Sequence, residues 1–128
     1  MYNIFKDLFV LDLANNHFGD VSHAKKIIKK FSEVVKKNKV KAAIKFQLRD
    51  YDTFIHKDFI NSDEKYVRRF LDTKLGISQF KELFNYVKEN KLLTACTPFD
   101  ENSVKIIENF KFDFLKIASV SSNDFTLL

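Results

Sequence analysis

Short apolar runs of strand length alternate along the chain with longer segments whose apolar residues recur every three or four positions. Four such runs predict strands, at residues 8–14, 41–47, 92–97 and 112–119. The helical period predicts helices at residues 22–39, 63–71 and 101–109, and another that Ser78 caps. Asp20 or Ser22 can cap the first helix, and Asp124 can open one after the last strand. This alternation predicts an α/β fold with a parallel sheet and right-handed crossovers.

Two connections stand out in this pattern. Residues 48–61 form a polar and aromatic stretch that is longer than a usual βα loop, and long loops in compact domains are often functional. Residues 15–20 follow the first strand, and Gly19 can take a positive φ there. Both connections follow the carboxyl end of a predicted strand, where parallel α/β enzymes place their chemistry.

The ends of the predicted strands carry polar side chains. Lys45 and Gln47 share a face of the second strand because side chains alternate, whereas Ile44 and Phe46 face the covering helices. A cation beside an amide suits a carboxylate or a phosphate. Ala43, on the same face as Lys45, leaves room for such a ligand.

The third and fourth strands add to this set. Lys116 has the same place on the fourth strand as Lys45 on the second, Ser119 offers a hydroxyl and a backbone donor, and Thr97 offers another hydroxyl. A buried lysine is costly without an anionic partner, so these residues predict a small, highly anionic ligand. The alternative is that both lysines reach solvent from edge positions.

Asp12 is a further polar residue inside a predicted strand. It is a candidate for a catalytic or metal-linked carboxylate. Equally, it can form a structural salt bridge with Lys45 or Lys116.

Composition limits the class of partner. The 128 residues carry a net charge of +5, which raises nucleic-acid binding as an alternative. However, the lysines fall mostly on predicted helix exteriors: Lys25, Lys26, Lys29, Lys30, Lys36, Lys37 and Lys39. The one cysteine, Cys96, excludes an internal disulfide and fits a reducing cytoplasm. Since no apolar run exceeds strand length, we expect neither a membrane partner nor a signal peptide.

Four motifs in order resemble the N-terminal half of the sialic acid synthase (N-acetylneuraminate synthase) and spore-coat polysaccharide synthase family. They are Asp12-Leu13-Ala14-Asn15-Asn16-His17-Phe18-Gly19, Lys45-Phe46-Gln47, Thr97-Pro98-Phe99-Asp100 and Leu115-Lys116-Ile117-Ala118-Ser119. The resemblance implies a TIM barrel of which residues 1–128 supply about the first four βα units, a half barrel. The C-terminal half barrel and an antifreeze-like domain are then absent from this chain, which we expect to be an incomplete fragment.

The resemblance also implies an activity and its residues. Phosphoenolpyruvate would be condensed with an N-acetylated amino sugar, N-acetylmannosamine or a related bacterial sugar, to give a nonulosonic acid and phosphate. Lys45, Gln47 and Thr97 would hold the carboxylate side of phosphoenolpyruvate, and Lys116 and Ser119 its phosphate. The catalytic set is expected to be Asp12, Lys45, Gln47 and Lys116, with Asp12 handling the attacking water. Asn16, His17 and Asp100 are expected to be structural or supporting.

The family resemblance further implies a divalent metal, Mn²⁺ or Mg²⁺, whose ligands come from later strands and not from this chain. Self-association, as a homodimer or otherwise, is also expected. Three positions depart from the family pattern: Asp12 replaces glutamate, Ala14 replaces glycine, and Ser121 stands where many members have a sugar-binding glutamate. Ser121 leaves the acceptor sugar open.

Two alternatives remain beside this assignment and the nucleic-acid module. One is a non-catalytic half barrel that associates with itself or another chain, because open sheet edges favour association. The other is a different phosphoenolpyruvate-dependent aldol synthase.

Overall fold

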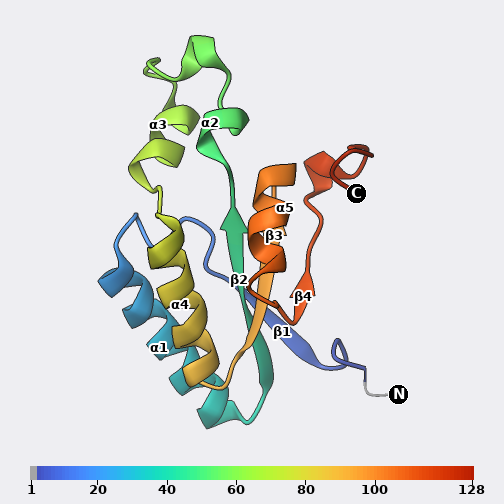
Figure 1. Ribbon diagram of the computed structural model, residues 1–128. Helices are drawn as coiled ribbons and strands as arrows, with labels where there is room; N and C mark the ends of the chain where they lie inside the picture. Colours follow the sequence, from blue (N-terminus) through green and yellow to red (C-terminus); the bar gives the residue numbers. More distant parts are fainter. Residues whose placement is uncertain (1–2) are drawn as a thin grey trace.

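Four parallel strands lie side by side in the order in which they occur along the chain (Figure 1). They are β1 (Leu8–Asp12), β2 (Lys41–Leu48), β3 (Leu93–Pro98) and β4 (Phe114–Leu115). The structure is a computed structural model and describes residues 3–128. A doubly wound sheet would reverse its strand order at one point, whereas sequential order keeps every crossover helix on one face. The predicted α/β class, of barrel type with about four βα units, is confirmed.

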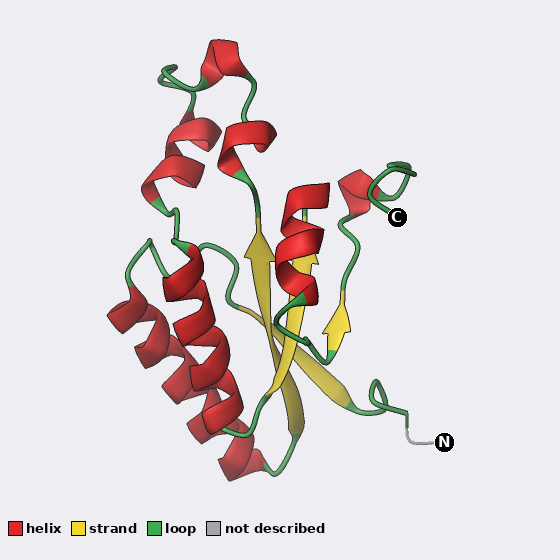
Figure 2. Cartoon of the chain, viewed as in Figure 1, coloured by secondary structure: helices red, strands yellow, loops and turns green. Residues whose placement is uncertain are grey.

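Three helices cover that face of the sheet: α1 (Val21–Asn38), α4 (Ile77–Glu89) and α5 (Glu101–Glu108) (Figure 2). The predicted cap of α1 is Asp20, whose Oδ1 accepts a hydrogen bond from the His23 N–H at 3.1 Å. Apolar side chains on one stripe of each helix reach the core, as the helical period requires. Ile28 of α1, Leu83 of α4 and Ile107 of α5 are all buried.

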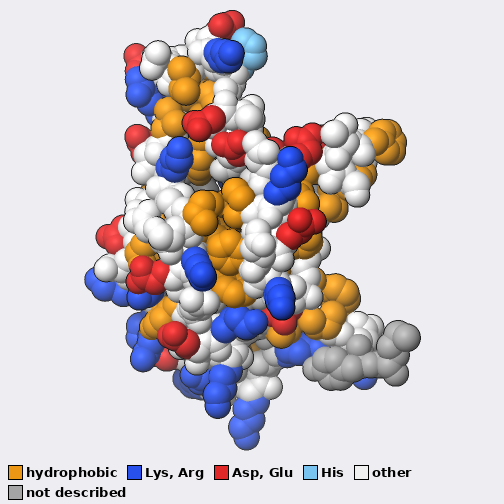
Figure 3. Space-filling model, in the orientation of Figure 1, with side chains coloured by type: hydrophobic (Ala, Val, Ile, Leu, Met, Phe, Trp, Pro, Cys, Tyr) orange, Lys and Arg blue, Asp and Glu red, His pale blue; other side chains and the backbone are white. Residues whose placement is uncertain are grey.

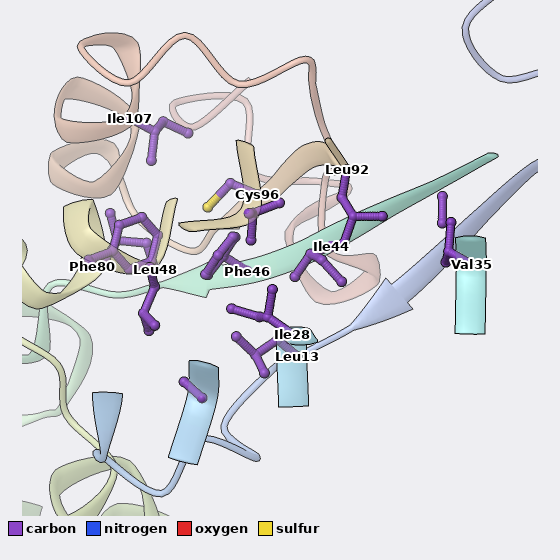
Figure 4. Packing of buried hydrophobic residues seen from close by; sticks show 14 residues of the cluster. Leu13, Ile28, Val35, Ile44, Phe46, Leu48, Phe80, Leu92, Cys96 and Ile107 are labelled. Atoms are coloured by element: carbon purple, nitrogen blue, oxygen red, sulfur yellow. The ribbon is translucent and has the colours of Figure 1, made fainter. Parts of the chain in front are cut away.

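The core lies between the sheet and these helices (Figure 4). Ile44 and Phe46 point from β2 into it, as the alternation predicted, and Cys96 points into it from β3. Phe46 belongs to a cluster of phenyl rings that pack mostly edge to face; the others are Phe80, Phe84, Phe110 and Phe112. Burial raises the pKa of the Cys96 thiol to about 12, so this cysteine is unreactive at neutral pH.

The connection from β2 to α4 contains two short helical turns where a long loop was expected at residues 48–61, and it contains the helix predicted at residues 63–71. It holds α2 (Tyr51–Phe54), the 3₁₀ turn η1 (Lys57–Phe59) and α3 (Lys65–Asp72). These elements lie beyond the carboxyl ends of the strands, at the top of Figure 1. They therefore form one wall of the region where the predicted ligand-binding side chains meet.

The predicted fourth strand, residues 112–119, is wrong in extent because β4 contains only two residues. Lys116 N still donates to Cys96 O at 2.9 Å, but the next ladder donor would be the nitrogen of Pro98. Proline has no N–H, so the ladder stops and the chain leaves the sheet. It continues into the 3₁₀ turn η2 (Ser119–Ser121).

Two predicted helix starts also differ. Ser78 is not the cap of α4, because Gly76 occupies the cap position and its N–H donates to Gln79 Oε1 at 2.8 Å. Asp124 opens a turn, in which its Oδ1 accepts from the N–H groups of Thr126 and Leu127. The start of α4 thus moves by two residues, whereas the helix expected after Asp124 is replaced by a turn within the described residues.

Charged side chains are unevenly spread over the surface (Figure 3). On the face shown, Lys and Arg side chains gather at the lower end of the view, where α1 ends and β2 begins. Hydrophobic side chains show between α4 and α5, where Ile77, Ile106 and Phe110 line a groove of about 310 Å³. Among residues 3–128, no helix has both the length and the apolar character needed to cross a membrane.

Candidate functional site

An ion pair joins the ends of β1 and β2. Lys45 Nζ lies 2.7 Å from Asp12 Oδ2, because the parallel register places these two residues side by side on the same face. The Lys45 side chain is 12% exposed and that of Asp12 is 47% exposed. Lys45 therefore does not extend freely into solvent. Asp12 pairs with Lys45 and not with Lys116, so the two residues can act as one charged unit beside a ligand.

Gln47 and Thr97 are paired in register at the ends of β2 and β3. Thr97 is 2% exposed, and its hydroxyl has no hydrogen-bond partner within the described part of the chain. A buried hydroxyl without a partner is costly, so it indicates a place where another molecule can supply an acceptor or a donor. Thr97 lies on the opposite face of β3 from Cys96, and so on the same face of the sheet as Lys45 and Gln47.

Arg49 is the site residue that the sequence analysis missed. It is 9% exposed, and its Nη2 donates to Gln47 Oε1 at 2.9 Å. Its guanidinium carbon lies 3.9, 4.7 and 5.4 Å from the ring centroids of Phe99, Phe70 and Phe54. The signal was present, because positions 45, 47 and 49 alternate onto one face of β2 and its continuation.

The charge of Arg49 is not neutralised by a carboxylate within residues 3–128. Its Nε is buried and has no partner there. Burial lowers the pKa of Arg49, and the nearby Tyr51 and Asp100 oppose that shift. Burial also raises the pKa of Tyr51, so at neutral pH the guanidinium stays charged beside a neutral phenol.

Lys116 and Ser119 differ from this group in their exposure to solvent. Both are exposed, and Lys116 follows β4 instead of lying inside a strand. Within residues 3–128, no hydrogen bond or ion pair links either side chain to Lys45, Gln47 or Thr97. The expectation that Lys116 lies inside a strand is therefore wrong, because β4 ends at Leu115 and Lys116 stands at the end of the sheet, with its N–H still bonded to Cys96 O.

The loop after β1 turns sharply beneath the site. Asn15 and His17 are each 7% exposed, whereas Asn16 is exposed. His17 Nδ1 accepts a hydrogen bond from the Gly19 N–H at 3.0 Å, which places the imidazole proton on Nε2. Burial lowers the pKa of His17, and the charge on His23 adds to this. His17 is thus a neutral side chain that fixes the loop.

A small cavity lies behind the strand tips, between this loop and the connection after β2. Its volume of about 10 Å³ is enough for one water molecule. Its polar lining comes from Asn15, His17, Gln47, Arg49, Tyr51 and Thr73. The cavity therefore joins the motif loop to the Arg49 side chain through polar groups, while remaining too small for a substrate.

Asp100 connects the two tip loops. Its Oδ2 accepts from the Asp50 N–H at 2.8 Å, and its Oδ1 accepts from the Ser103 N–H at 2.7 Å as the cap of α5. Asn102 Nδ2 donates to Asp50 Oδ2 at 2.7 Å and completes the link. Both side-chain hydrogen bonds of Asp100 within the described residues hold these loops in place.

A metal centre is not formed by the described residues. No three His, Cys, Asp or Glu side chains within residues 3–128 are arranged to hold a metal ion. His17, His23 and His56 come from the motif loop, α1 and the connection after α2.

Comparison with protein families identifies the family to which this chain belongs. The sequence profile of the NeuB family matches residues 33–128. The chain belongs to the NeuB family. The matched segment contains three of the four motifs that carry the resemblance, and the resemblance to sialic acid synthases is confirmed at the level of the family.

Solved structures share the fold. A crystal structure of a candidate spore coat polysaccharide biosynthesis protein E from Chromobacterium violaceum superposes with a TM-score of 0.90 and 40% identity. It aligns with 94% of this chain and 36% of that protein. The N-acetylneuraminic acid (sialic acid) synthetase of Leptospira borgpetersenii, solved in complex with citrate, has a TM-score of 0.74 and 23% identity. That match covers 94% of this NeuB family chain and 39% of the synthetase, and it supports the fold.

An uncharacterized protein of Methanocaldococcus jannaschii is 31% identical over 113 residues, or 88% of this chain. The chain spans 31% of the length of that relative. This NeuB family chain therefore corresponds to between 31% and 39% of the length of these three proteins.

Proposed function

We propose that this chain supplies the phosphoenolpyruvate-binding strand tips of a sialic acid synthase-like enzyme. Such an enzyme condenses phosphoenolpyruvate with an N-acetylated amino sugar, N-acetylmannosamine or a related bacterial sugar, to a nonulosonic acid and phosphate. Family membership supports the class of enzyme. The observation that carries the proposal is the buried Thr97 hydroxyl, which lacks a partner beside Gln47 and on the face that carries Lys45.

The charges at this edge suit a small anion. Lys45 and Arg49 place two cations on the same side of β2 and its continuation, and one of them has no carboxylate partner within residues 3–128. Gln47 and Thr97 add neutral hydrogen-bonding groups between them. At an effective dielectric of about 20, a cation about 4 Å from an anion contributes about 4 kcal/mol, which favours phosphoenolpyruvate over a neutral ligand.

In the proposed reaction, the methylene carbon of phosphoenolpyruvate forms a bond with the aldehyde carbon of the open-chain sugar. The aldehyde oxygen takes a proton and becomes a hydroxyl. Water adds to the resulting cationic carbon and loses a proton. The C–O bond to phosphate then breaks, its electron pair leaves with phosphate, and the new hydroxyl loses its proton to give the keto group. Asp12 is proposed to accept the proton from water, and Lys45 holds its carboxylate in place.

Lys116 and Ser119 are proposed to bind the phosphate. Both are exposed at the end of β4, where they can move toward a ligand. A divalent metal, Mn²⁺ or Mg²⁺, would polarise the aldehyde in the complete enzyme. The described residues form no metal site, so none of them is proposed to bind this metal.

The complete protein is proposed to close a TIM barrel with later strands, to carry an antifreeze-like domain, to self-associate and to act in the cytoplasm. A second candidate function is a half barrel that associates without catalysis. Exposed apolar side chains on the edge strands favour it: Phe9 and Val10 are 57% and 45% exposed, and Leu115 is 49% exposed. Sedimentation over a wide concentration range tests it, because a strictly monomeric protein would exclude self-association.

Titration with phosphoenolpyruvate tests the leading proposal. Saturable shifts of the amide signals around Lys45 and Thr97 are expected at millimolar ligand, with the shifts lost in Lys116→Ala. Lys105→Ala is the matched control, because Lys105 is an exposed lysine on α5. If the signals around Lys45 do not respond to the ligand, this chain does not bind phosphoenolpyruvate and the proposal fails.

A further inference from the structure

We propose that Arg49 is a positioning residue that fixes the orientation of the Gln47 amide, so that Gln47 presents its NH₂ group to an acceptor oxygen of the ligand. This inference rests on the proposed function, because it concerns the same anion site. It assigns a role to a residue outside the four sequence motifs. It also specifies the chemistry of the ligand atom that Gln47 recognises.

The hydrogen bond defines the amide orientation. Arg49 Nη2 lies 2.9 Å from the Gln47 side chain, and a guanidinium has donors but no acceptor. The amide atom that faces Arg49 must therefore be the oxygen. Gln47 forms no other side-chain hydrogen bond within residues 3–128, so its NH₂ group is the part left for a ligand.

The phenyl rings fix the arginine in turn. Phe54 belongs to α2, Phe70 to α3 and Phe99 to the turn between β3 and α5, and their ring centroids lie 3.9 to 5.4 Å from the guanidinium carbon. Arg49 is 9% exposed within this cage. A planar guanidinium packed against aromatic rings has little freedom to rotate, so its hydrogen bond to Gln47 keeps one direction.

The orientation selects the ligand atom. An NH₂ group donates, so the atom that binds Gln47 is a carboxylate, phosphate or carbonyl oxygen and not an ammonium group. Thr97, in register with Gln47, has a buried hydroxyl that can donate to the same group. The net positive charge that Arg49 brings also favours an anion over a neutral acceptor. Phosphoenolpyruvate has acceptor oxygens at both ends and meets these requirements.

A double-mutant cycle tests the indirect role. Phosphoenolpyruvate affinity is measured for the wild type, Gln47→Ala, Arg49→Met and the double variant, after circular dichroism confirms that each is folded. Each single change is expected to lower the affinity for phosphoenolpyruvate about fivefold or more. The double variant is expected to bind no more weakly than the single variant with the lower affinity. Losses that multiply would show that Arg49 acts on the ligand independently of Gln47, and would overturn the inference.

Gln47→Glu provides the second test. The carboxylate keeps an oxygen toward Arg49 but replaces the NH₂ donor with a second acceptor. Binding is expected to fall about tenfold or more while the melting temperature stays equal or rises, because the pair becomes charge-assisted. Unchanged binding would show that the Gln47 donor is not used. Arg68→Met is the matched control for Arg49→Met, because Arg68 is an arginine on α3 whose side chain is 48% exposed.

Two further results keep the outcomes separate. If Arg49→Met does not fold, Gln47→Glu and the side-chain NH₂ signals of Gln47 in the wild type decide the question, since these signals must shift on titration. If the wild type shows no saturable binding of phosphoenolpyruvate, the proposed function and this inference fail together. If the wild type binds phosphoenolpyruvate and substitution of Gln47 does not weaken that binding, only this inference fails.

Discussion

Lys45 and Asp12 form an ion pair across two strands, with 2.7 Å between Nζ and Oδ2. The lysine is mostly buried and the carboxylate is half exposed, so the pair presents its acidic member to the site. A ligand anion that approaches Lys45 must therefore share it with Asp12. Asp12, the proposed proton acceptor, therefore also lowers the affinity of the site for an anion.

Asp12→Asn is expected to tighten phosphoenolpyruvate binding about three- to tenfold. The change removes a negative charge next to the cation that the ligand uses, and even at the dielectric of water two charges about 4 Å apart interact by about 1 kcal/mol. Calorimetric or NMR titration at low and high salt measures it, because the gain should shrink with salt. In the complete enzyme the same change should lower turnover.

Glu82→Gln is the control for Asp12→Asn. Glu82 pairs with Lys25 at 2.6 Å on the helix surface, and both side chains are partly exposed. The substitution removes the same charge from the helix layer, on the other side of the sheet from Lys45, and should leave binding unchanged. Equal tightening in both variants would mean that only the net charge of the protein matters.

Thr97→Val and Thr94→Val are expected to have opposite effects. Both residues lie buried on β3, but the Thr94 hydroxyl donates to Asp113 Oδ2 at 2.8 Å whereas the Thr97 hydroxyl has no partner within the described residues. Thr97→Val should leave the free energy of unfolding unchanged or higher and weaken phosphoenolpyruvate binding severalfold. Thr94→Val should cost about 1–3 kcal/mol of stability and leave binding by folded molecules intact. Urea unfolding and ligand titration of both variants measure this, and destabilisation by Thr97→Val would show that its hydroxyl is structural.

His17 should make stability depend on pH below neutrality. Its pKa is lowered from the ordinary value of 6.5 by burial, so the unfolded chain takes up a proton at a higher pH than the folded chain. The free energy of unfolding is therefore expected to fall as the pH drops through 6.5, by up to about 1.4 kcal/mol per pH unit, and to be flat above it. Urea unfolding at pH 7.5, 6.5 and 5.5 measures the slope.

His17→Gln should reduce that slope, whereas His56→Gln, at a side chain that is 72% exposed, should leave it unchanged. An identical slope in the wild type and His17→Gln would show that other groups titrate.

Ala14→Gly should stabilise the protein. Ala14 has a φ of +43°, in the left-handed region that costs a side chain roughly 1–2 kcal/mol. Part of the gain is offset because glycine has more freedom in the unfolded chain, so we expect roughly 0.5–1 kcal/mol. Gly19→Ala should have the opposite sign, because Gly19 has a φ of +72° and a new Cβ would lie 3.1 Å from Asp72 O. Thermal unfolding compares the two, and a loss of stability in Ala14→Gly would contradict the prediction.

The order of strands and helices was predictable because it depends on local periodicity. Asp20 as a cap and the inward direction of Ile44 and Phe46 follow from the same local rules, and the structure confirms them. The place of Lys45 and Gln47 on one face also required only the alternation of β2. Their partners depended on the register between strands, which a single sequence does not define.

The remaining differences come from contacts between distant segments. The length of β4 depends on Pro98 of its neighbour, and Arg49 is buried only because α2, α3 and the turn before α5 bring phenyl rings to it. The chain has 15 Phe residues, and their number alone does not distinguish rings of the core from rings around an arginine. Short-range propensities do not contain this information.

The rings around Arg49 also give the protein an internal spectroscopic probe. Protons above the face of a phenyl ring are shielded by its circulating electrons, so the side-chain resonances of Arg49 should lie at unusually high field. Because Phe54, Phe70 and Phe99 come from separate segments, movement of any one of them changes that shielding. Rearrangement of α2 or α3 around a bound ligand would thus be visible in the spectrum without attaching a label.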